Sequence, residues 1–273
     1  MRGFVSAGID QLPKALLVVA HPDDEYAVAA TVYRITHELG GTVDQVIVTN
    51  GEGGYRYSQL AEAIYGATLT DEVTGRSRLP EIRKREVREA GRILGIRKHY
   101  FLEQRDSSFN TDAAEPLNGL WDLQLISSRL RRLLKRERYD YVFVLLPTSD
   151  THGHHQAVAL LAIEEVMRLP EDSRPVVLGA HAGQQVRFRG QFARFVVDRR
   201  DAVAQAGSMT YHVVVNWVIA AHKSQGLFQM DAGKHHDEQF WILATGTSEA
   251  TAHADQLFAQ LTPEPIALHA YAS

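Results

Sequence analysis

A histidine and three consecutive acids follow an apolar stretch near the start of the chain. The residues VVAHPDDE include His21, and Asp23, Asp24 and Glu25 come almost directly after it. Adjacent carboxylates repel one another and resist burial, so a positive group is needed to hold them together. Imidazole and carboxylate groups are both common ligands of divalent metal ions. The sequence therefore predicts a metal site in this segment.

The spacing of these residues suggests separate roles. His21 and Asp24 are three residues apart, so on a tight turn both side chains could converge on one ion, with Asp23 close by but off the metal. A catalytic zinc ion commonly has three protein ligands and an open position for water. Asp23 could then act as general base on that water, whose pKa the ion lowers towards about 7. A third ligand could come from the histidine cluster at His152, His154 and His155.

Each of these features also has an ordinary structural explanation. A histidine at the end of a strand is most often only hydrogen-bonded, and acids are favoured at the N-terminus of a helix such as one beginning at Tyr26. Histidines in a polar loop are often solvated. The combination favours a metal site, because both clusters follow predicted strands and together supply the required ligand types.

Four short apolar runs are typical of buried parallel strands. They are rich in β-branched residues and continuous rather than alternating, as in a sheet covered on both faces. The runs cover residues 15–20, 46–49, 141–146 and 176–178, and helical patterns cover 29–39, 80–94, 120–135 and 156–167. This order predicts an α/β fold with a Rossmann-like open, mostly parallel sheet and helices on both faces.

In such a sheet, ligands bind beyond the carboxyl ends of the strands. Residues 21–25, 50–54 and 147–155 follow three of the predicted strands and could face one cleft, which would be the active site. We expect one domain over residues 1–273, with a possible lid insertion at 52–79 that contains a short helical piece around 59–64. Elaboration of the sheet edge is expected after residue 207, where 211–219 and 240–243 could be strands.

Composition limits the classes of protein and of site. Hydrophobic content of 45% and charged content of 23% are typical of a globular protein, and a net charge of -4 argues against a nucleic-acid partner held by a basic surface. The chain contains no cysteine, so a transition-metal site must use His, Asp and Glu. The first twenty residues resemble neither a signal peptide nor a membrane span. We therefore expect a cytoplasmic protein with a small-molecule partner; the sequence does not specify its oligomeric state.

The segment AHPDDE at residues 20–25 resembles the signature of the LmbE-like, or PIG-L, family of zinc-dependent N-acetylglucosamine deacetylases. The resemblance extends from about residue 14 to about residue 226. Further similar segments are TNGEGG at 49–54, the Arg-x-x-Glu helix at 82–96, RDS at 105–107, HGHHQAV at 152–158 in the place of a His-x-x-His motif, and HKSQ at 222–225.

The resemblance implies roles for particular residues. Zinc would be bound by His21, Asp24 and His155. Asp23 would be the general base, and His152 would stabilise the oxyanion or act as general acid. Arg83 and Asp106 would bind the sugar, although Arg83 lies on a helix with four other basic residues, and such a helix is usually a solvated face. Iron(II) could replace zinc, because nitrogen and oxygen donors do not select strongly between them.

The chain departs from the family pattern in two respects. Members usually read His-Pro-Asp-His, whereas here Gly153 and His154 form the middle pair, so either His154 or His155 could be the third ligand. Some members have a tyrosine that assists the oxyanion two residues before the first histidine. That position is Asp150 here, and a carboxylate cannot donate a hydrogen bond unless it is protonated.

The predicted function is metal-dependent hydrolysis of an N-acetyl group on an amino sugar or sugar conjugate. One alternative is an amidase acting on a larger N-acyl conjugate in secondary metabolism. Another is a non-catalytic sugar-binding or metal-binding homologue. Asp23 favours an enzyme, because metal ligation alone does not require it.

Overall fold

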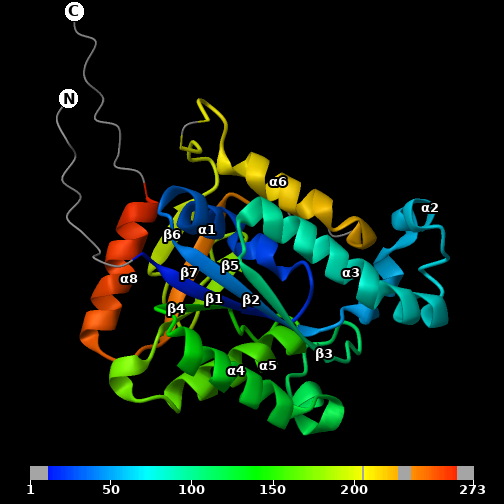
Figure 1. The fold of residues 1–273 in the computed structure, drawn as a ribbon, viewed down its shortest axis with the longest axis horizontal. Coiled ribbons are helices and arrows are strands. Elements are labelled where there is room, and N and C mark those ends of the chain that lie inside the picture. The colour runs from blue at the N-terminus through cyan, green and yellow to red at the C-terminus, as the bar shows by residue number, and fades with distance from the viewer. Residues whose placement is uncertain (1–11, 205, 227–234, 263–273) are drawn as a thin grey trace, which may run out of the picture.

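The protein is built around one seven-stranded open sheet (Figure 1). The computed structural model describes residues 12–204, 206–226 and 235–262. The strand order is β3-β2-β1-β4-β5-β7-β6, with β1 to β5 parallel and β7 antiparallel to both of its neighbours. The strands are β1 (Lys14–Val19), β2 (Thr42–Thr49), β3 (Lys98–Gln104), β4 (Tyr141–Leu145), β5 (Val176–Ala182), β6 (Phe195–Asp198) and β7 (Asp237–Ala244). The predicted α/β fold with a mostly parallel sheet is confirmed.

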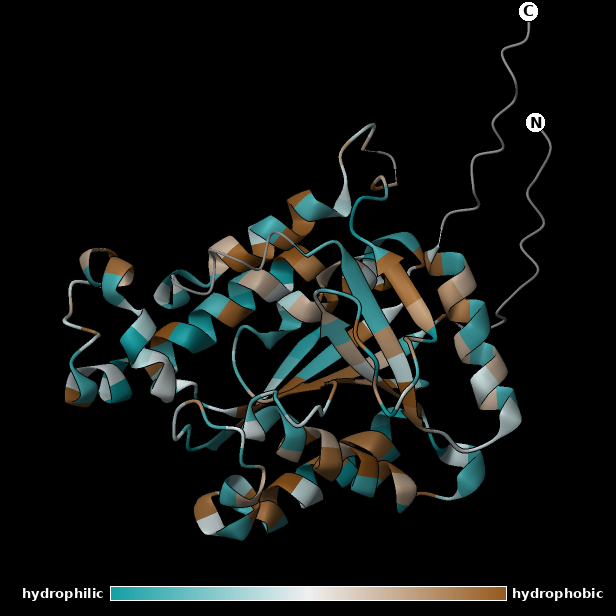
Figure 2. Ribbon diagram, turned by 180° about the vertical axis from the view of Figure 1, so that it is seen from behind, coloured by the Kyte–Doolittle hydropathy of each residue, from teal (hydrophilic) through white to brown (hydrophobic). Residues whose placement is uncertain are grey.

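Helices cover both faces of this sheet (Figure 1). One layer contains α1 (Ala29–Tyr33), α3 (Glu72–Leu94) and α6 (Tyr211–Ala221), and the opposite layer contains α4 (Leu123–Glu137) and α5 (Gly153–Met167). The described residues also form α2 (Glu62–Tyr65) and α8 (Ser248–Leu261). In Figure 2 the helices alternate between hydrophobic and hydrophilic residues, as expected when one side packs on a sheet and the other meets solvent.

The continuous apolar run of β1 results from burial on both faces. Ala15, Leu17 and Val19 belong to one hydrophobic cluster, whereas Leu16 and Val18 belong to the cluster on the opposite face. Successive side chains of a strand point to opposite faces, so a central strand needs apolar residues at every position. The same requirement explains why the sequence pattern located this strand.

The prediction of a strand at residues 211–219 is wrong, because this segment forms helix α6. Its buried residues are Tyr211, Val214, Val215, Val218 and Ile219. This spacing of three and four residues is the helical pattern, and the abundance of valine concealed it. The strand expected at 240–243 is confirmed within β7, which pairs antiparallel with β5.

The segment at 52–79 is more ordered than a long loop. A 3-10 helix covers Glu52–Tyr57, and the helical piece expected around 59–64 is present as a short 3-10 turn followed by α2. Helix α3 begins at Glu72, capped by Asp71, whose Oδ1 accepts a hydrogen bond from the Thr74 N–H at 2.9 Å. It continues through Pro80, where the sequence pattern had placed its start.

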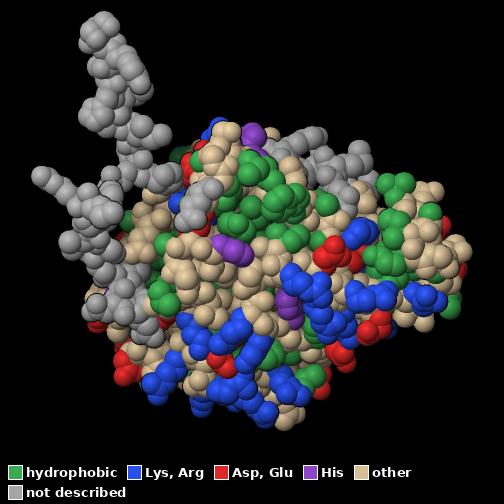
Figure 3. Space-filling model, turned by 45° about the horizontal axis from the view of Figure 1, so that its top comes forward, with side chains coloured by type: hydrophobic (Ala, Val, Ile, Leu, Met, Phe, Trp, Pro, Cys, Tyr) green, Lys and Arg blue, Asp and Glu red, His purple; other side chains and the backbone are tan. Residues whose placement is uncertain are grey.

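Charged side chains are unevenly distributed over the surface. Figure 3 shows Lys and Arg side chains gathered towards the bottom of the view and hydrophobic side chains near its top. Helix α4 contributes Arg129, Arg132 and Arg136 to the wall of a groove beside β3. Among the residues that the structure describes, no helix is both long and apolar enough to cross a membrane.

Candidate active site

The carboxyl end of β1 leads directly into the acidic motif. Asp24 begins the 3-10 helix η1 (Asp24–Val28) and turns its side chain back towards the strand. Its Oδ2 accepts hydrogen bonds from the backbone N–H groups of Ala20 at 3.0 Å and His21 at 2.7 Å. The main chain therefore fixes the orientation of this carboxylate, and Oδ1 remains directed at the histidine cluster.

His155 completes a compact set of donors with the first motif. Its Nε2 lies 3.1 Å from Nδ1 of His21 and 3.1 Å from Oδ1 of Asp24. The distance from His21 Nδ1 to Asp24 Oδ2 is 3.6 Å. Tetrahedral ligands at the usual zinc distances of about 2.0–2.1 Å are separated by about 3.3 Å. The spacing of these three side chains therefore fits a divalent metal ion.

The charges of these residues are also suited to a cation. Burial disfavours the ionised form of Asp24, but His155 and His21 hold the pKa of its carboxyl well below the usual range. Burial also opposes charge on His21, yet the Asp24 carboxylate outweighs this effect and raises the pKa of the imidazole. The group thus attracts a positive charge, and a metal ion would take the place of the proton.

Asp23 lies beside this set but pairs with a different residue. Its Oδ2 is 2.9 Å from Nη2 of Arg83, and the carboxylate lines the same cavity as the three donors. Burial raises the pKa of Asp23, although the Arg83 guanidinium partly opposes that rise. The acid is therefore separate from the donor set, close to it, and less acidic than a solvated aspartate.

Arg83 does not belong to a solvated face, because only 2% of its surface is exposed. Besides pairing with Asp23, it donates to the carbonyl oxygens of Gly51 at 2.6 Å and Pro22 at 3.2 Å. Gly51 has a φ of 70°, and a Cβ there would lie 2.5 Å from Arg83 Nη1. The guanidinium thus connects the loops after β1 and β2, and it also lines the cavity.

Asp106 follows β3 and also faces the cavity. Its carboxylate accepts hydrogen bonds from the backbone N–H groups of Ser108 at 2.9 Å and Gly53 at 3.2 Å. Burial opposes ionisation, but His21 and the Ser108 N–H together lower the pKa of Asp106. The side chain is a fixed anion in the wall of the cavity.

Two histidines flank His21 from opposite sides of its ring. His155 lies at Nδ1, whereas fully buried His154 places its Nδ1 3.1 Å from His21 Nε2. The other nitrogen of His154, Nε2, is 3.2 Å from the Ser107 hydroxyl. His154 also belongs to a second set of possible donors, with His21, Asp106 and His152. Both histidines considered from the sequence are therefore adjacent to His21, and only His155 also contacts Asp24.

His152 occupies the N-cap position of α5. Its Nδ1 accepts a hydrogen bond from the backbone N–H of His154 at 3.2 Å, and its ring packs against Phe109 at 5.2 Å between centroids. Burial and the neighbouring His21 lower the pKa of His152 to about 2. A neutral ring that accepts at Nδ1 carries its proton on Nε2, so His152 can serve as a hydrogen-bond donor.

Each of the three consecutive acids has a different positive partner. Asp23 pairs with Arg83, and Asp24 lies against His21 and His155. Fully buried Glu25 contacts Nε2 of His222 at 2.5 Å, and His222 belongs to the C-terminal HKSQ segment. The sequence called for a positive group to hold these acids, and a metal ion near Asp24 was predicted. The fold adds Arg83 beside Asp23 and His222 beside Glu25.

A cavity of about 450 Å³ lies at the carboxyl ends of β1, β2 and β3 and is here named the β3-side cavity. The predicted site residues in its wall are His21, Asp23, Asp24, Arg83, Asp106, His152 and His155. Beyond the predicted residues, its wall includes Tyr57, Ser108, Phe109 and Gln225. Phe109 is 65% exposed. Phe109 lies just after the RDS segment, and nothing in the local sequence distinguishes it from an ordinary loop residue.

Comparison with known proteins identifies the family. Residues 16–166, more than half of the chain, match the model described as PIG-L, GlcNAc-PI de-N-acetylase. A probable N-acetyl-alpha-D-glucosaminyl L-malate deacetylase 2 from Bacillus cereus is 23% identical over 210 residues, which cover 77% of this chain and 82% of the relative.

Solved structures have the same fold at low sequence identity. N,N'-diacetylchitobiose deacetylase from Pyrococcus horikoshii is 20% identical, with a TM-score of 0.55 over 86% of this chain and 88% of that one. The 4-carboxy-2-hydroxymuconate hydratase GalB from Pseudomonas putida is 15% identical, with a TM-score of 0.61 over 86% and 98%. The fold thus supports more than one chemistry, and the family follows from the sequence match: the chain belongs to the PIG-L, or LmbE-like, deacetylase family.

Proposed function

We propose that the protein is a metal-dependent hydrolase that removes an N-acetyl group from an amino sugar or sugar conjugate. The observation that carries this proposal is the convergence of His21, Asp24 and His155 at metal-ligand spacing, with Asp23 beside them in one cavity. The named deacetylases among the similar proteins act on N-acetylated sugars. Family membership and geometry thus support the same reaction class.

The three donors would hold Zn²⁺, or Fe²⁺ with the same ligands. Such an ion supplies two things: polarisation of the amide carbonyl and a water molecule of lowered pKa. In this arrangement His155 is the third ligand, because it contacts both His21 and Asp24. His154 then accepts a hydrogen bond from the Nε2–H of His21, which fixes the tautomer that leaves Nδ1 available.

Asp23 would accept the proton of the attacking water. Its raised pKa suits a general base, and Arg83 holds the carboxylate in position through the 2.9 Å ion pair. His152 would donate from Nε2 to the oxygen that gains negative charge. This donor is neutral, which favours the role of oxyanion stabiliser over that of general acid. With Asp150 in place of a tyrosine, His152 supplies the donor that such a tyrosine would otherwise give.

The β3-side cavity would bind the amine part of the substrate. Asp106 can accept from a sugar hydroxyl, and the exposed ring of Phe109 offers an apolar face of the kind on which sugars pack. Arg83 was predicted to bind sugar. Its contacts in the structure support positioning of Asp23 as its principal role, and a hydroxyl contact remains a further prediction.

Acetate release tests the proposal directly. Metal-free protein reconstituted with Zn²⁺ or Fe²⁺ should release acetate from N-acetylglucosamine or its conjugates, and a chelator should abolish the release reversibly. If the protein bound the sugar but released no acetate with either metal, the alternative of a non-catalytic sugar-binding homologue would be supported instead. If the protein added water to an unsaturated acid and cleaved no amide, its reaction would instead resemble that of the hydratase GalB.

A further inference from the structure

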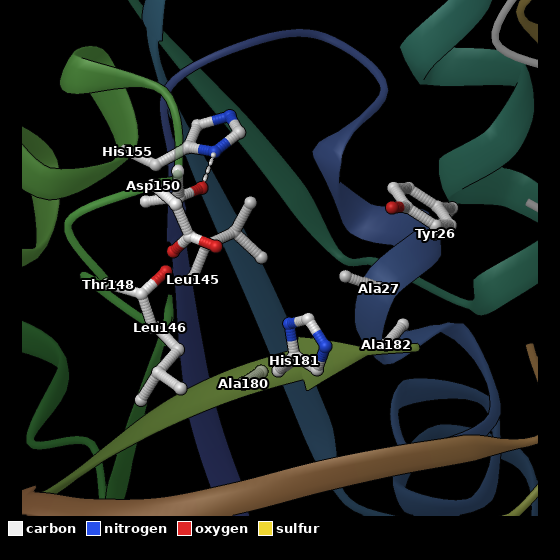
Figure 4. Close-up of a pocket in the computed structure, with 11 residues that line it drawn as sticks. Tyr26, Ala27, Leu145, Leu146, Thr148, Asp150, His155, Ala180, His181 and Ala182 are labelled. Atoms are coloured by element: carbon white, nitrogen blue, oxygen red, sulfur yellow. Dashed lines mark hydrogen bonds between the residues drawn. The ribbon is translucent and has the colours of Figure 1, made fainter. Parts of the chain in front are cut away.

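A second cavity, of about 270 Å³, lies on the other side of His155 (Figure 4). It is here named the β5-side cavity, because the carboxyl ends of β4 and β5 and the start of η1 form its walls. Asp150, Thr151 and His155 line this cavity and the β3-side cavity alike. The proposed metal ligand His155 therefore stands between two separate spaces.

An amide substrate needs space in two directions from its carbonyl carbon. The amine part extends one way and the acyl part the other, so a site built around the carbonyl needs a compartment for each. The β3-side cavity holds Asp23, Arg83 and Asp106 and suits a polyhydroxylated amine. This assignment leaves the β5-side cavity for the acyl group.

We propose that the β5-side cavity binds the acyl part of the substrate and admits acyl chains longer than acetyl that end in an uncharged polar group. This inference rests on the proposed function and specifies the substrate class of the same site. An acetyl methyl group would occupy only a small part of the 270 Å³. The space suits a chain of several carbon atoms.

The wall of this cavity matches such a chain. Its apolar part consists of small and aliphatic side chains, Ala27, Leu145, Leu146, Ala180 and Ala182. Its polar part consists of Tyr26, Thr148, Asp150 and His181. In Figure 4, Asp150 and Thr148 lie on the side of His155, Tyr26 faces them across the space, and His181 points up from β5. Methylene groups can pack on the alanines while a terminal hydroxyl or amide meets the polar side chains.

The carboxylate of Asp150 limits the charge of the chain end. Asp150 lines both cavities, so an anionic acyl group in the β5-side cavity would have to approach a like charge. A hydroxyl-ended or amide-ended acyl group meets no such repulsion. At equal chain length, we therefore expect the protein to prefer amides of a hydroxy acid over amides of a dicarboxylic acid.

Thr148→Phe tests this assignment, because Thr148 is a half-buried residue of the cavity wall and a larger side chain there would reduce the space for the acyl chain. The wild-type protein should hydrolyse N-acetyl-glucosamine and N-(4-hydroxybutanoyl)-glucosamine with kcat/KM values within about tenfold of each other. The variant should lose at least about tenfold more kcat/KM on the longer amide than on the acetyl amide. Thr111→Phe, at an exposed position outside both cavities, is the matched control.

Binding of the free acid gives a second measurement that does not depend on turnover. 4-Hydroxybutanoate should bind wild-type protein more tightly than acetate or succinate, and Thr148→Phe should remove that advantage. This result would support the acyl cavity even if no amide were cleaved, in which case the proposed function alone would fail. The assignment would be overturned if Thr148→Phe kept the acyl preference of the wild-type protein or lost activity equally on both amides. Acetate release by the wild-type protein would still uphold the proposed function in that case.

Discussion

The guanidinium of Arg83 lies 2.9 Å from the carboxylate of Asp23, and both side chains are buried next to the proposed metal ligands. Arg83 also donates to carbonyl oxygens in the loops after β1 and β2, at Pro22 and Gly51. One side chain therefore connects the acidic motif, the glycine-rich loop and helix α3. These contacts of Arg83 fix the position of the Asp23 carboxylate, the proposed general base.

Replacing Asp23 by asparagine should separate catalysis from metal binding. The amide has nearly the same size but cannot accept a proton from water, so kcat should fall by about 10²–10⁴-fold. The metal content should remain that of the wild-type protein, because Asp23 lies outside the donor set. Parallel kcat and metal analyses measure both effects. Wild-type turnover in a fully loaded Asp23→Asn protein would remove this residue from the role of base.

Replacing Arg83 by methionine should destabilise the fold. The change leaves Asp23 buried without its cation, and breaking a buried ion pair in this way costs about 3–5 kcal/mol of unfolding free energy. Urea denaturation measures the loss. The exposed Arg85 on the same helix gives the control, and Arg85→Met should change stability by no more than about 0.5 kcal/mol. Equal stability of the two variants would contradict the anchoring role of Arg83.

Replacing His154 by alanine should weaken the metal site although His154 is not one of the three proposed ligands. The change removes the acceptor 3.1 Å from His21 Nε2, and loss of such a partner typically reduces metal affinity by about 10–100-fold. His154→Gln, which keeps an acceptor, should recover part of the affinity. Competition with a chromogenic chelator gives the dissociation constants. Unaltered zinc affinity in His154→Ala would exclude this role.

The stability of the protein should fall in acid partly through Glu137. Hydrogen bonds from Lys14 and Arg97 lower the pKa of this carboxyl from 4.5 to about 2. Because the pKa of Glu137 is lower in the folded than in the unfolded protein, its ionised form stabilises the fold when the pH is above the unfolded-state pKa. That contribution disappears as the pH falls from about 4.5 to about 2. Glu137→Gln should therefore flatten the dependence of the unfolding free energy on pH in this window. An identical acid transition in the two proteins would show that the ion pairs around Glu137 do not contribute.

The parts of the fold that the sequence predicted are those set by burial on both faces of the sheet. The apolar runs of β1, β2, β4 and β5 located the parallel core, and the rule for the carboxyl ends of strands placed the two histidine-containing loops together. The valine-rich segment at 211–219 was misassigned, because local β propensity masked its helical spacing.

Features that depend on contacts between distant segments could not be predicted from the sequence. Local sequence does not indicate that Arg83 turns inward while Arg85 remains exposed, or that Glu25 pairs with His222, 197 residues away. The same is true of the β5-side cavity, whose walls come from three separate parts of the chain. Such features depend on tertiary packing and appear only when the strands are placed side by side.

Anomalous diffraction at the zinc edge from crystals of the zinc-loaded protein tests the metal centre most directly. We expect a peak at ligand distance from His21 Nδ1, Asp24 and His155 Nε2, with the Asp23 carboxylate beyond coordination distance. A peak on the other side of the His21 ring, among His154, His152 and Asp106, would contradict it, as would no peak within reach of His21.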